Sequence, residues 1–414
     1  MIEFNSLIIY ISSYIGLFAI TFYFLSYFNK EEPILEEIPE KKLPMVSIII
    51  PAWNEEDTIQ KTVESILVSN YKDFEVLVID DGSKDNTFKI AKNLEEKYPK
   101  LKVFHKENGG KASALNFGIE RAKGRFIFTM DADTYVHSDS VKKMVRYFKN
   151  PEVMCVSPAM LVYKPKSILQ RIQQAEYLLG LFLRKAFASL DSIFVTPGAF
   201  SAYRKEFFEK HGGYEVGNIT EDLELALRIQ FNGYRIENCP DAPAWTIAPS
   251  IFKESLFQRR RWYHGWMKNL WKYRKIFGKK YGDLGSFVIP IAGINVLFSI
   301  VVLLYAFFRT LFNIKEEILF LTSINFDFSG FFNINLYIIE RFLFLFFSNP
   351  IMIFILVFIV IFTIYTKYAT RKTGKVPGLL YNFFLFFVFF SIIFGFWWIV
   401  SIIYTIFHKN VKWR

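Results

Sequence analysis

Cysteines and the common nucleotide-binding motifs are scarce or absent in this sequence. Its 414 residues include only two cysteines, Cys155 and Cys239, which are far apart and supply neither a disulfide framework nor a zinc site. We expect both to be ordinary buried core thiols. There is no G-x-x-x-x-G-K-[ST] motif and no G-x-G-x-x-G after the first predicted strand, which excludes a P-loop and a dinucleotide fingerprint.

Acidic residues are fewer than basic ones, with 39 Asp and Glu and 50 Lys and Arg.

Apolar residues, by contrast, are in excess. The sequence is 52% hydrophobic and 19% aromatic, which is more than one water-soluble core of this size normally hides. Part of the chain is therefore expected to lie in a lipid bilayer, as an integral, multi-pass protein of the cell membrane.

Four long apolar runs are candidate membrane spans: Ser6–Phe28, Phe287–Phe312, Leu336–Tyr365 and Leu379–Phe407. The first lacks a basic leader and a small-residue cleavage site, which favours an uncleaved anchor. The third is interrupted by Ser348-Asn349-Pro350, and we interpret it as an interfacial piece followed by a helix from about Pro350. The predicted organisation is an N-terminal transmembrane helix (1–30), a linker (31–43), an α/β domain (44–250), interfacial amphipathic helices (251–283) and a C-terminal membrane region with about three transmembrane helices (284–414).

Clusters of Lys and Arg beside the spans predict the orientation in the membrane. Trp271–Lys280 precedes the second span and Lys367–Lys375 follows the third, so both should be cytoplasmic. The large domain then lies in the cytoplasm. The same count leaves the basic tail, His408–Arg414, outside, so either this short tail escapes the rule or one span is only interfacial.

Apolar strands alternate with helical patterns in the large domain. The predicted strands are Met45–Ile50, Phe74–Ile79, Leu101–His105 and Phe126–Met130, and the predicted helices include Thr58–Val68 and Ala112–Ala122. This alternation predicts a parallel, doubly wound α/β sheet whose ligand lies beyond the carboxyl ends of the strands. Acidic motifs follow several of these ends.

Two of those carboxylates, Asp131 and Asp133, stand one small residue apart after the fourth strand. Their oxygens suit a hard divalent cation such as Mg²⁺ or Mn²⁺, which could stabilise the charge of a pyrophosphate leaving group. A lone D-x-D is usually a solvated acidic turn, but its position at a strand end favours a metal site. Without a P-loop, nucleotide binding must come from the metal together with Glu55, Asp80 and Asp81.

Six motifs in a fixed order carry a family resemblance. They are PAWNEE (51–56), DDGSKDNT (80–87), NGGKASALN (108–116), DAD (131–133), TED (220–222) and QRRRW (258–262). Over about Val46 to Trp262 the chain resembles the family 2 inverting glycosyltransferases, above all the membrane-integrated synthases of cellulose, hyaluronan, chitin and poly-N-acetylglucosamine, and ceramide glucosyltransferase. The resemblance implies a GT-A type, doubly wound mixed sheet inserted between transmembrane helices.

The resemblance also implies roles for individual residues. Those that would bind the nucleotide are Pro51, Trp53, Glu55, Asp80, Asp81, Lys111 and Asp131, with the two adjacent aspartates at the base and the lysine near the phosphates. Asp131 and Asp133 would hold the metal, the second as the direct ligand. Asp222, next to Glu221, would be the general base that takes the proton of the acceptor hydroxyl. Locally, Thr220 could instead be a helix N-cap with both acids in the first turn.

The last motif would complete the acceptor side. The resemblance assigns Trp262 to the acceptor sugar and Arg261 with Gln258 to the diphosphate, which fits an indole face and a planar cation. The segment Phe252–Lys272 can also be interpreted as a basic amphipathic helix with its Trp and Tyr at the lipid headgroups, and both roles can hold together. Thr196–Arg204 resembles the acceptor-side loop, although a plain turn fits nearly as well.

The sequence thus predicts a metal-dependent inverting glycosyltransferase that uses a nucleotide sugar, UDP-linked, to extend a polysaccharide at the cytoplasmic membrane face. Having one N-terminal span and no W-G-T-R motif leaves processivity and secretion open. One alternative is transfer of a single sugar to a lipid acceptor. Another is a non-enzymatic nucleotide-binding receptor or transporter, against which the scarcity of ionisable residues inside the spans argues. The expected partners are the donor, the acceptor and the bilayer, with no nucleic acid.

Overall fold

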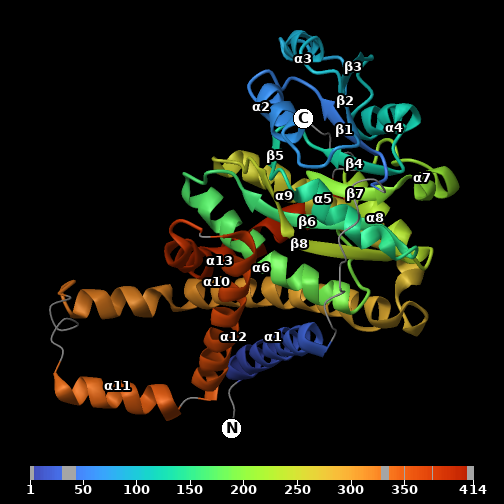
Figure 1. The fold of residues 1–414 in the computed structure, drawn as a ribbon. Helices are drawn as coiled ribbons and strands as arrows, with labels where there is room; N and C mark the ends of the chain where they lie inside the picture. The colour runs from blue at the N-terminus through green and yellow to red at the C-terminus, as the bar shows by residue number, and fades with distance from the viewer. Residues whose placement is uncertain (1–3, 30–42, 328–334, 349, 375, 408–414) are drawn as a thin grey trace.

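The computed structural model describes residues 4–29, 43–327, 335–348, 350–374 and 376–407 (Figure 1). Almost all of the predicted linker 31–43, and the basic tail 408–414, lie outside the described residues. The strands of the α/β domain are β1 (Val46–Ala52), β2 (Phe74–Asp80), β3 (Leu101–His105), β4 (Phe126–Met130), β5 (Thr134–Val136), β6 (Val153–Val162), β7 (Phe200–Arg204) and β8 (Arg235–Thr246).

These strands form one eight-stranded sheet in the order β3-β2-β1-β4-β7-β6-β8-β5. The strands β3, β2, β1 and β4 are parallel. β7 runs antiparallel to β4 and β6, and β5 runs antiparallel to β8. The parallel arrangement predicted for the first four strands and the mixed α/β sheet implied by the resemblance are both confirmed. The antiparallel pairs come from the later strands, which the local pattern did not include.

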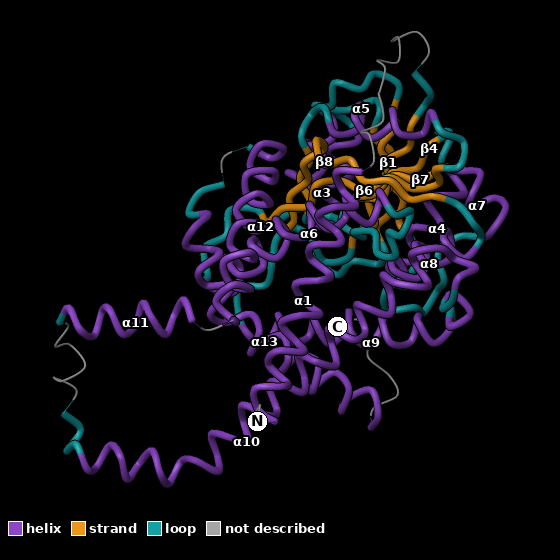
Figure 2. Tube along the Cα trace, turned by 90° about the horizontal axis from the view of Figure 1, so that it is seen from below, coloured by secondary structure: helices purple, strands orange, loops and turns teal. Residues whose placement is uncertain are grey.

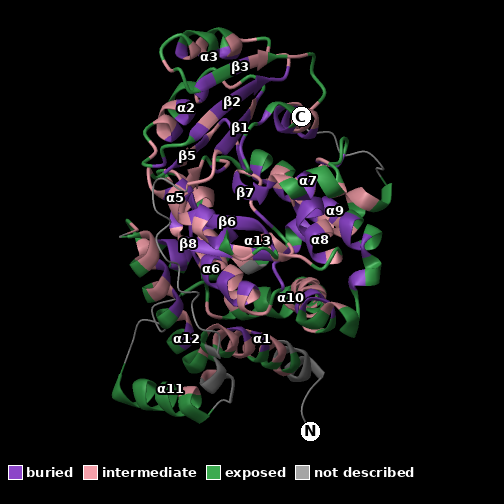
Figure 3. Cartoon of the chain, turned by 45° about the vertical axis from the view of Figure 1, so that its right-hand side comes forward, coloured by how far each residue is buried: buried purple, intermediate pink, exposed green. Residues whose placement is uncertain are grey.

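The sheet is buried on both faces, which explains why its strands are almost continuously apolar. Ile48 and Ile50 point into one hydrophobic cluster, and Ile49 between them points into the cluster on the opposite face. Every residue of β4 and β6 is buried. Figure 3 shows this buried layer at the centre of the domain.

Helices cover the sheet and continue the chain towards the membrane region. They are α2 (Ile59–Leu67), α3 (Thr87–Glu95), α4 (Lys111–Arg121), α5 (Ser140–Val145), α6 (Ile168–Ser189), α7 (Lys205–His211), α8 (Glu221–Phe231) and α9 (Phe252–Lys272), with short 3-10 or π segments at Arg146–Lys149, Arg274–Ile276, Lys279–Tyr281 and Leu284–Val288. α6, to which we assigned no element from the sequence, starts at a capping box between Ser167 and Gln170.

The register of the sheet brings the acidic motifs to one edge. Ala52 at the end of β1 lies opposite Asp80 at the end of β2, and β4 runs beside β1 in the same direction. β7 enters antiparallel to β4, with Phe200 opposite Met130, so the loop before β7 reaches the same edge. The motifs after β1, β2 and β4 therefore meet the Thr196–Arg204 segment.

Five long helices make up the rest: α1 (Phe4–Asn29), α10 (Ile289–Ser323), α11 (Leu336–Ser348), α12 (Pro350–Thr373) and α13 (Leu379–Phe407). α6 packs against α1, α12 and α13, and α9 packs against α13. Figures 1 and 2 show α11 and the far part of α10 projecting away from the sheet. Their surface is largely exposed and apolar (Figure 3).

Among the described residues, one helix is long and apolar enough to cross a membrane, at Leu284–Ser323, or two if α13 counts as one span despite its 48° bend. α1 contributes a shorter apolar stretch, Ser13–Phe28. α12 begins at Pro350, as predicted, and α11 ends at Ser348, while the position between them lies outside the described residues. The helix that contains the predicted second span, Phe287–Phe312, continues to Ser323.

Candidate active site

The carboxylates of Glu55, Asp131 and Asp133 lie near one another at the carboxyl ends of β1 and β4. Burial raises the pKa of Asp133 to about 7, and the negative charges of Asp131 and Glu55 add to that increase. The backbone N–H of Asp131 donates to the carbonyl of Ala199, which fixes the start of the turn. Oxygen ligands that repel one another when ionised suit a divalent cation, so Asp131 and Asp133 fit the predicted Mg²⁺ or Mn²⁺.

No group of three or more His, Cys, Asp or Glu side chains in the described part of the chain is arranged to hold a metal ion by itself. Two carboxylates can suffice for Mg²⁺, which usually keeps water and substrate phosphates in its shell. The aspartate pair therefore fits a cation that arrives with a diphosphate.

Lys111, the first residue of α4, connects the two acidic motifs. Its Nζ lies 2.5 Å from Oδ1 of Asp131 and 3.3 Å from Oε1 of Glu221. Burial alone would lower the pKa of Lys111, but the charges of Asp131, Glu221 and Asp222 raise it above its ordinary value. A permanent ammonium group thus stands between the DAD and TED motifs. The predicted contact with phosphates stays a prediction.

The TED motif forms the start of α8. Oδ2 of Asp222 accepts a hydrogen bond from the Gly198 N–H at 3.0 Å, and Oδ1 accepts one from the Leu223 N–H at 2.8 Å. Any Cβ at position 198 would lie 2.7 Å from Oδ2 of Asp222, so this close approach requires glycine. Glu221 is buried, which raises its pKa to about 7 against the opposing charge of Lys111.

The N-cap interpretation of Thr220 is only partly right. Thr220 occupies the N-cap position and both acids lie in the first turn, but its side chain makes no capping hydrogen bond. Its hydroxyl oxygen instead accepts a hydrogen bond from Nδ2 of Asn269 on α9, at 3.0 Å. Tertiary contact with α9 has replaced the local cap.

The residues predicted to bind the nucleotide line the ends of β1 and β2. Trp53 is 37% exposed, and Pro51 is half-buried in β1. Asp80 is fully buried, and its Oδ2 lies 2.6 Å from Nδ1 of His105. Oδ1 of Asp80 has no hydrogen-bond partner among the described residues. Whether these side chains contact a nucleobase stays a prediction.

Asp81 holds the loop that leads into α4. Its carboxylate accepts hydrogen bonds from the backbone N–H groups of Gly109 and Gly110, and from Nζ of Lys106. Gly110 has φ of +84°, a conformation that glycine adopts without strain. Asp81 therefore helps to place Lys111, and its contact with a nucleotide stays a prediction.

The QRRRW motif lies on α9, against α6 and α13. Oε1 of Gln258 accepts a hydrogen bond from Gln173 on α6, at 3.3 Å. Arg259 forms a bidentate ion pair with Glu176 of α6, and its guanidinium lies 4.7 Å from the ring centre of Trp262 and 4.9 Å from that of Trp397. Arg261 and Trp262 are half-buried on the same helix.

The headgroup interpretation of α9 is wrong for part of its aromatic face. Tyr263 stacks on Trp398 of α13 with ring centres 4.2 Å apart, and Trp266 contacts the same ring. These side chains therefore pack against protein rather than lipid. Phe257 and Trp271 remain exposed and available to a headgroup layer.

Breaking the Arg259–Glu176 pair should destabilise the protein. Arg259 is only 2% exposed, so Arg259→Ala would leave a carboxylate without its cation and remove two stacking contacts. We expect a loss of about 3 kcal/mol, seen as a lower unfolding temperature in detergent. Arg274→Ala, at an exposed position in the 3-10 segment that follows α9, is the matched control and should change little. Equal unfolding temperatures for the two variants would contradict a stabilising role.

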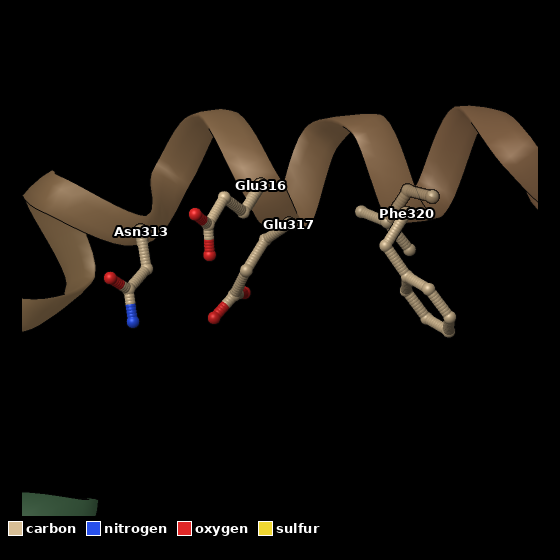
Figure 4. A pocket seen from close by; sticks show the side chains of 5 residues that line it. Asn313, Glu316, Glu317 and Phe320 are labelled. Carbon is tan, nitrogen blue, oxygen red and sulfur yellow. The ribbon is translucent and has the colours of Figure 1, made fainter.

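The structure also places the remaining sequence features. Cys155 and Cys239 are buried and unpaired, as predicted. His264 contacts Thr405 of α13 through Nδ1, and His211 stacks on Phe207, so both have structural surroundings. A recess on α10 is lined by Asn313, Glu316, Glu317, Phe320 and Leu321 (Figure 4). It contains none of the site residues.

Several site residues were missed from the sequence. Glu176, Gln173 and Asn269 are polar residues on long helices, and each contacts a motif that is distant in the chain. Their signal was weak, because an isolated polar residue in a helix usually faces solvent. Polar residues on the buried side of the amphipathic α6 were the feature that could have revealed Gln173 and Glu176.

Comparison with known proteins identifies the domain. Residues 47–212 match the family described as Glycosyl transferase family 2. Over 271 residues the chain is 31% identical to the poly-beta-1,6-N-acetyl-D-glucosamine synthase of Staphylococcus aureus (strain MSSA476), covering 63% of this chain and 65% of that protein. The synthase of Staphylococcus epidermidis is 30% identical over 250 residues, covering 58% and 60%. The chain thus spans about 65% of the length of the former relative.

The fold has a solved counterpart over nearly the whole chain. Mannosyltransferase PcManGT from Pyrobaculum calidifontis, in complex with GDP-Man and Mn²⁺, aligns with 97% of this chain and 98% of its own, with a TM-score of 0.62 at 18% identity. The α/β domain therefore has the GT-A type fold of glycosyltransferases. Its residues 47–212 match glycosyl transferase family 2, in agreement with the resemblance seen in the motif series.

Proposed function

We propose that this chain is a divalent-metal-dependent, inverting glycosyltransferase that moves a sugar from a UDP-sugar to a growing polysaccharide at the cytoplasmic face of the membrane. One observation carries the proposal. The DAD and TED motifs converge on one ammonium group, that of Lys111, whose side chain is only 15% exposed, at the carboxyl edge of the sheet. The proposed metal ligands and the motif of the proposed general base therefore both lie next to Lys111.

We propose that Asp131, Asp133 and Lys111 stabilise the leaving group. The two aspartates would hold Mg²⁺ or Mn²⁺, which supplies a positive charge that stabilises a departing nucleoside diphosphate. Lys111 places a second positive charge next to Asp131 and can donate hydrogen bonds to diphosphate oxygens. Arg261 and Gln258 on α9 are proposed to bind the same diphosphate.

We propose that Asp222 activates the attacking hydroxyl of the acceptor. The Asp222 carboxylate would take the proton from the acceptor hydroxyl as that oxygen attacks the anomeric carbon from the face opposite the diphosphate. The N–H groups of Gly198 and Leu223 hold the carboxylate in one orientation. Glu221 is proposed to keep Lys111 in place rather than to act as the base, because it is buried and faces that ammonium group.

The choice of a polysaccharide acceptor rests on the 31% identity to a poly-beta-1,6-N-acetyl-D-glucosamine synthase. We therefore propose UDP-N-acetylglucosamine as the first donor to test. Transfer of one sugar to a lipid is the alternative, supported by the close packing of α9 against α13 beside the membrane region. The non-enzymatic alternative loses its basis, because the domain belongs to a glycosyltransferase family.

The membrane placement belongs to the same proposal. α1, α10, α12 and α13 would lie in the bilayer, with the basic segments 271–280 and 367–375 on the cytoplasmic side. α6 and α9 would lie at the interface, where a product could pass to the membrane.

A donor panel tests the proposed function. Purified protein in detergent should release labelled product from UDP-N-acetylglucosamine more than from UDP-glucose or GDP-mannose, and EDTA should stop it until Mn²⁺ is restored. A ladder of oligomers on sizing supports a polysaccharide, and a single glycolipid supports the lipid acceptor. Release of free sugar alone, or no turnover of any donor, would contradict the proposed function.

Removing the indole of Trp262 separates acceptor binding from donor binding. Trp262→Ala should raise the KM for acceptor about 10-fold or more while leaving the affinity for UDP within about threefold, because the ring is proposed to stack on the acceptor sugar. Steady-state kinetics and UDP titration give the two quantities. Trp271→Ala, a 74% exposed tryptophan on the same helix, is the control. Loss of UDP affinity in Trp262→Ala would contradict this division of the pocket.

A further inference from the structure

The turn that carries the proposed base is held by a buried amide pair. Nδ2 of Asn218 donates to Oδ1 of Asn269 at 2.9 Å, and Nδ2 of Asn269 lies 3.3 Å from Oδ1 of Asn218. Asn269 is 1% exposed and Asn218 is 8% exposed. Two primary amides that satisfy each other in a buried site define one relative position of their backbones, since any shift leaves polar atoms without partners.

The same pair fixes Thr220, two residues before Asp222. The Thr220 N–H donates to Oδ1 of Asn218 at 3.1 Å, and the Thr220 hydroxyl oxygen accepts from Nδ2 of Asn269 at 3.0 Å. The backbone N–H and the hydroxyl of this residue are therefore held by the amide pair. Because Thr220 is the N-cap residue of α8, its position sets where the helix starts and where the Asp222 carboxylate lies.

A glycine on α9 makes this contact close. A Cβ at Gly265 would lie 2.1 Å from the hydroxyl oxygen of Thr220, so a larger residue would push α9 and α8 apart. Gly265 and Asn269 are four residues apart, one turn along the same helix face. Gly265 leaves room for Thr220 to approach α9, and Asn269 donates the hydrogen bond to its hydroxyl oxygen.

α9 also carries Trp262, three residues before Gly265. Trp262 and Asn269 are therefore separated by about 10 Å along one continuous helix. The acceptor-side indole and the support of the base turn belong to the same rigid element. On the other side of the base, the Gly198 N–H holds the Asp222 carboxylate.

We propose that Asn269 and Gly265 are positioning residues for glycosyl transfer, which fix the Asp222 carboxylate relative to the acceptor sugar on Trp262. The inference rests on the proposed function and adds a support for the base that lies outside the sequence motifs. Neither residue touches substrate. Each acts through Thr220, and the expected loss is in the turnover step rather than in donor binding.

The test compares kcat with donor binding in purified full-length protein. Asn269→Ala should lower kcat for transfer from the UDP-sugar about 30- to 100-fold, as expected for misplacement of a reacting group by about 1 Å. The donor KM and the affinity for UDP should stay within about threefold. Asn232→Ala, an exposed asparagine at the other end of α8, is the matched control and should keep its kcat within about twofold.

A second pair of variants keeps the test decisive if Asn269→Ala folds poorly. Thr220→Val replaces the accepting hydroxyl by a methyl group of similar shape and should reproduce the fall in kcat. Thr220→Ser keeps the hydroxyl and should recover most of it. A merely structural role would lower the unfolding temperature of Thr220→Val and leave the kcat of the folded protein unchanged, which would overturn the proposal.

The outcomes separate this inference from the proposed function. Turnover by the wild type, loss of turnover in Asp222→Asn, and full kcat in both Asn269→Ala and Thr220→Val would overturn the positioning role alone. No sugar transfer by the wild type from any UDP-sugar would overturn the function on which the role rests.

Discussion

Asp222→Asn should lower kcat for sugar transfer by about 10³-fold while UDP affinity changes by no more than a few-fold. The asparagine oxygen can still accept the hydrogen bond from the Gly198 N–H, and only the bond from the Leu223 N–H is lost, so the variant should fold. It cannot take the proton of the acceptor hydroxyl, and the attacking oxygen remains a weak nucleophile. Initial rates with labelled UDP-sugar and a parallel UDP titration measure the two effects.

The control for this variant is Asp73→Asn, an exposed aspartate just before β2, at the opposite end of that strand from the site. It should behave as the wild type. Unchanged turnover in Asp222→Asn would exclude Asp222 as the base and turn attention to Glu221. Loss of UDP binding would mean that Asp222 belongs to the donor pocket.

Asp133→Asn should remove most of the metal-dependent rate. If the carboxylate is a direct ligand of Mg²⁺ or Mn²⁺, its loss should cost several kcal/mol of transition-state stabilisation, a fall in kcat/KM of about 10³-fold. UDP should then bind equally well with and without Mn²⁺, as measured by calorimetry. Asp139→Asn, a half-buried aspartate six residues along the chain, should retain its Mn²⁺ dependence.

The raised pKa of Asp133 gives this prediction a pH dependence. Because the pKa is about 7 without metal, the carboxyl is mostly protonated at pH 6 and mostly ionised at pH 8. A proton competes with the cation for the carboxylate, so Mn²⁺ affinity should rise from pH 6 to pH 8 and binding should release protons at the lower pH. Affinity for Mn²⁺ that is independent of pH across this range, or that falls, would contradict a role for Asp133 as ligand.

Much of the fold and of the acidic edge could be predicted from the sequence. Runs such as Phe126–Met130 are short, apolar and followed by polar turns, and β4 has these same bounds. Parallel βα units place the following residues at one edge, so Asp81, Asp131 and Asp133 were expected together. The family match over residues 47–212 agrees with the resemblance and covers the first four of the six motifs. These features are local, and local patterns report them well.

The remainder depends on contacts between distant segments. Glu176 and Arg259 are 83 residues apart, and Thr220 and Asn269 are 49 residues apart. Nothing in the sequence around Thr220 distinguishes an N-cap that bonds its own helix from one that bonds α9. The contact between Tyr263 of α9 and Trp398 of α13 also joins distant segments, and for that reason part of the lipid-facing interpretation of α9 was wrong.

The most direct test of the central claim is the position of Mn²⁺ in the protein with UDP bound, located by its anomalous scattering in a crystal. We expect one ion in contact with the Asp133 carboxylate and the diphosphate, with the Asp222 carboxylate facing the same space from the opposite side. An ion elsewhere, or UDP bound with no ion near Asp133, would contradict a metal-dependent transferase built on this edge of the sheet.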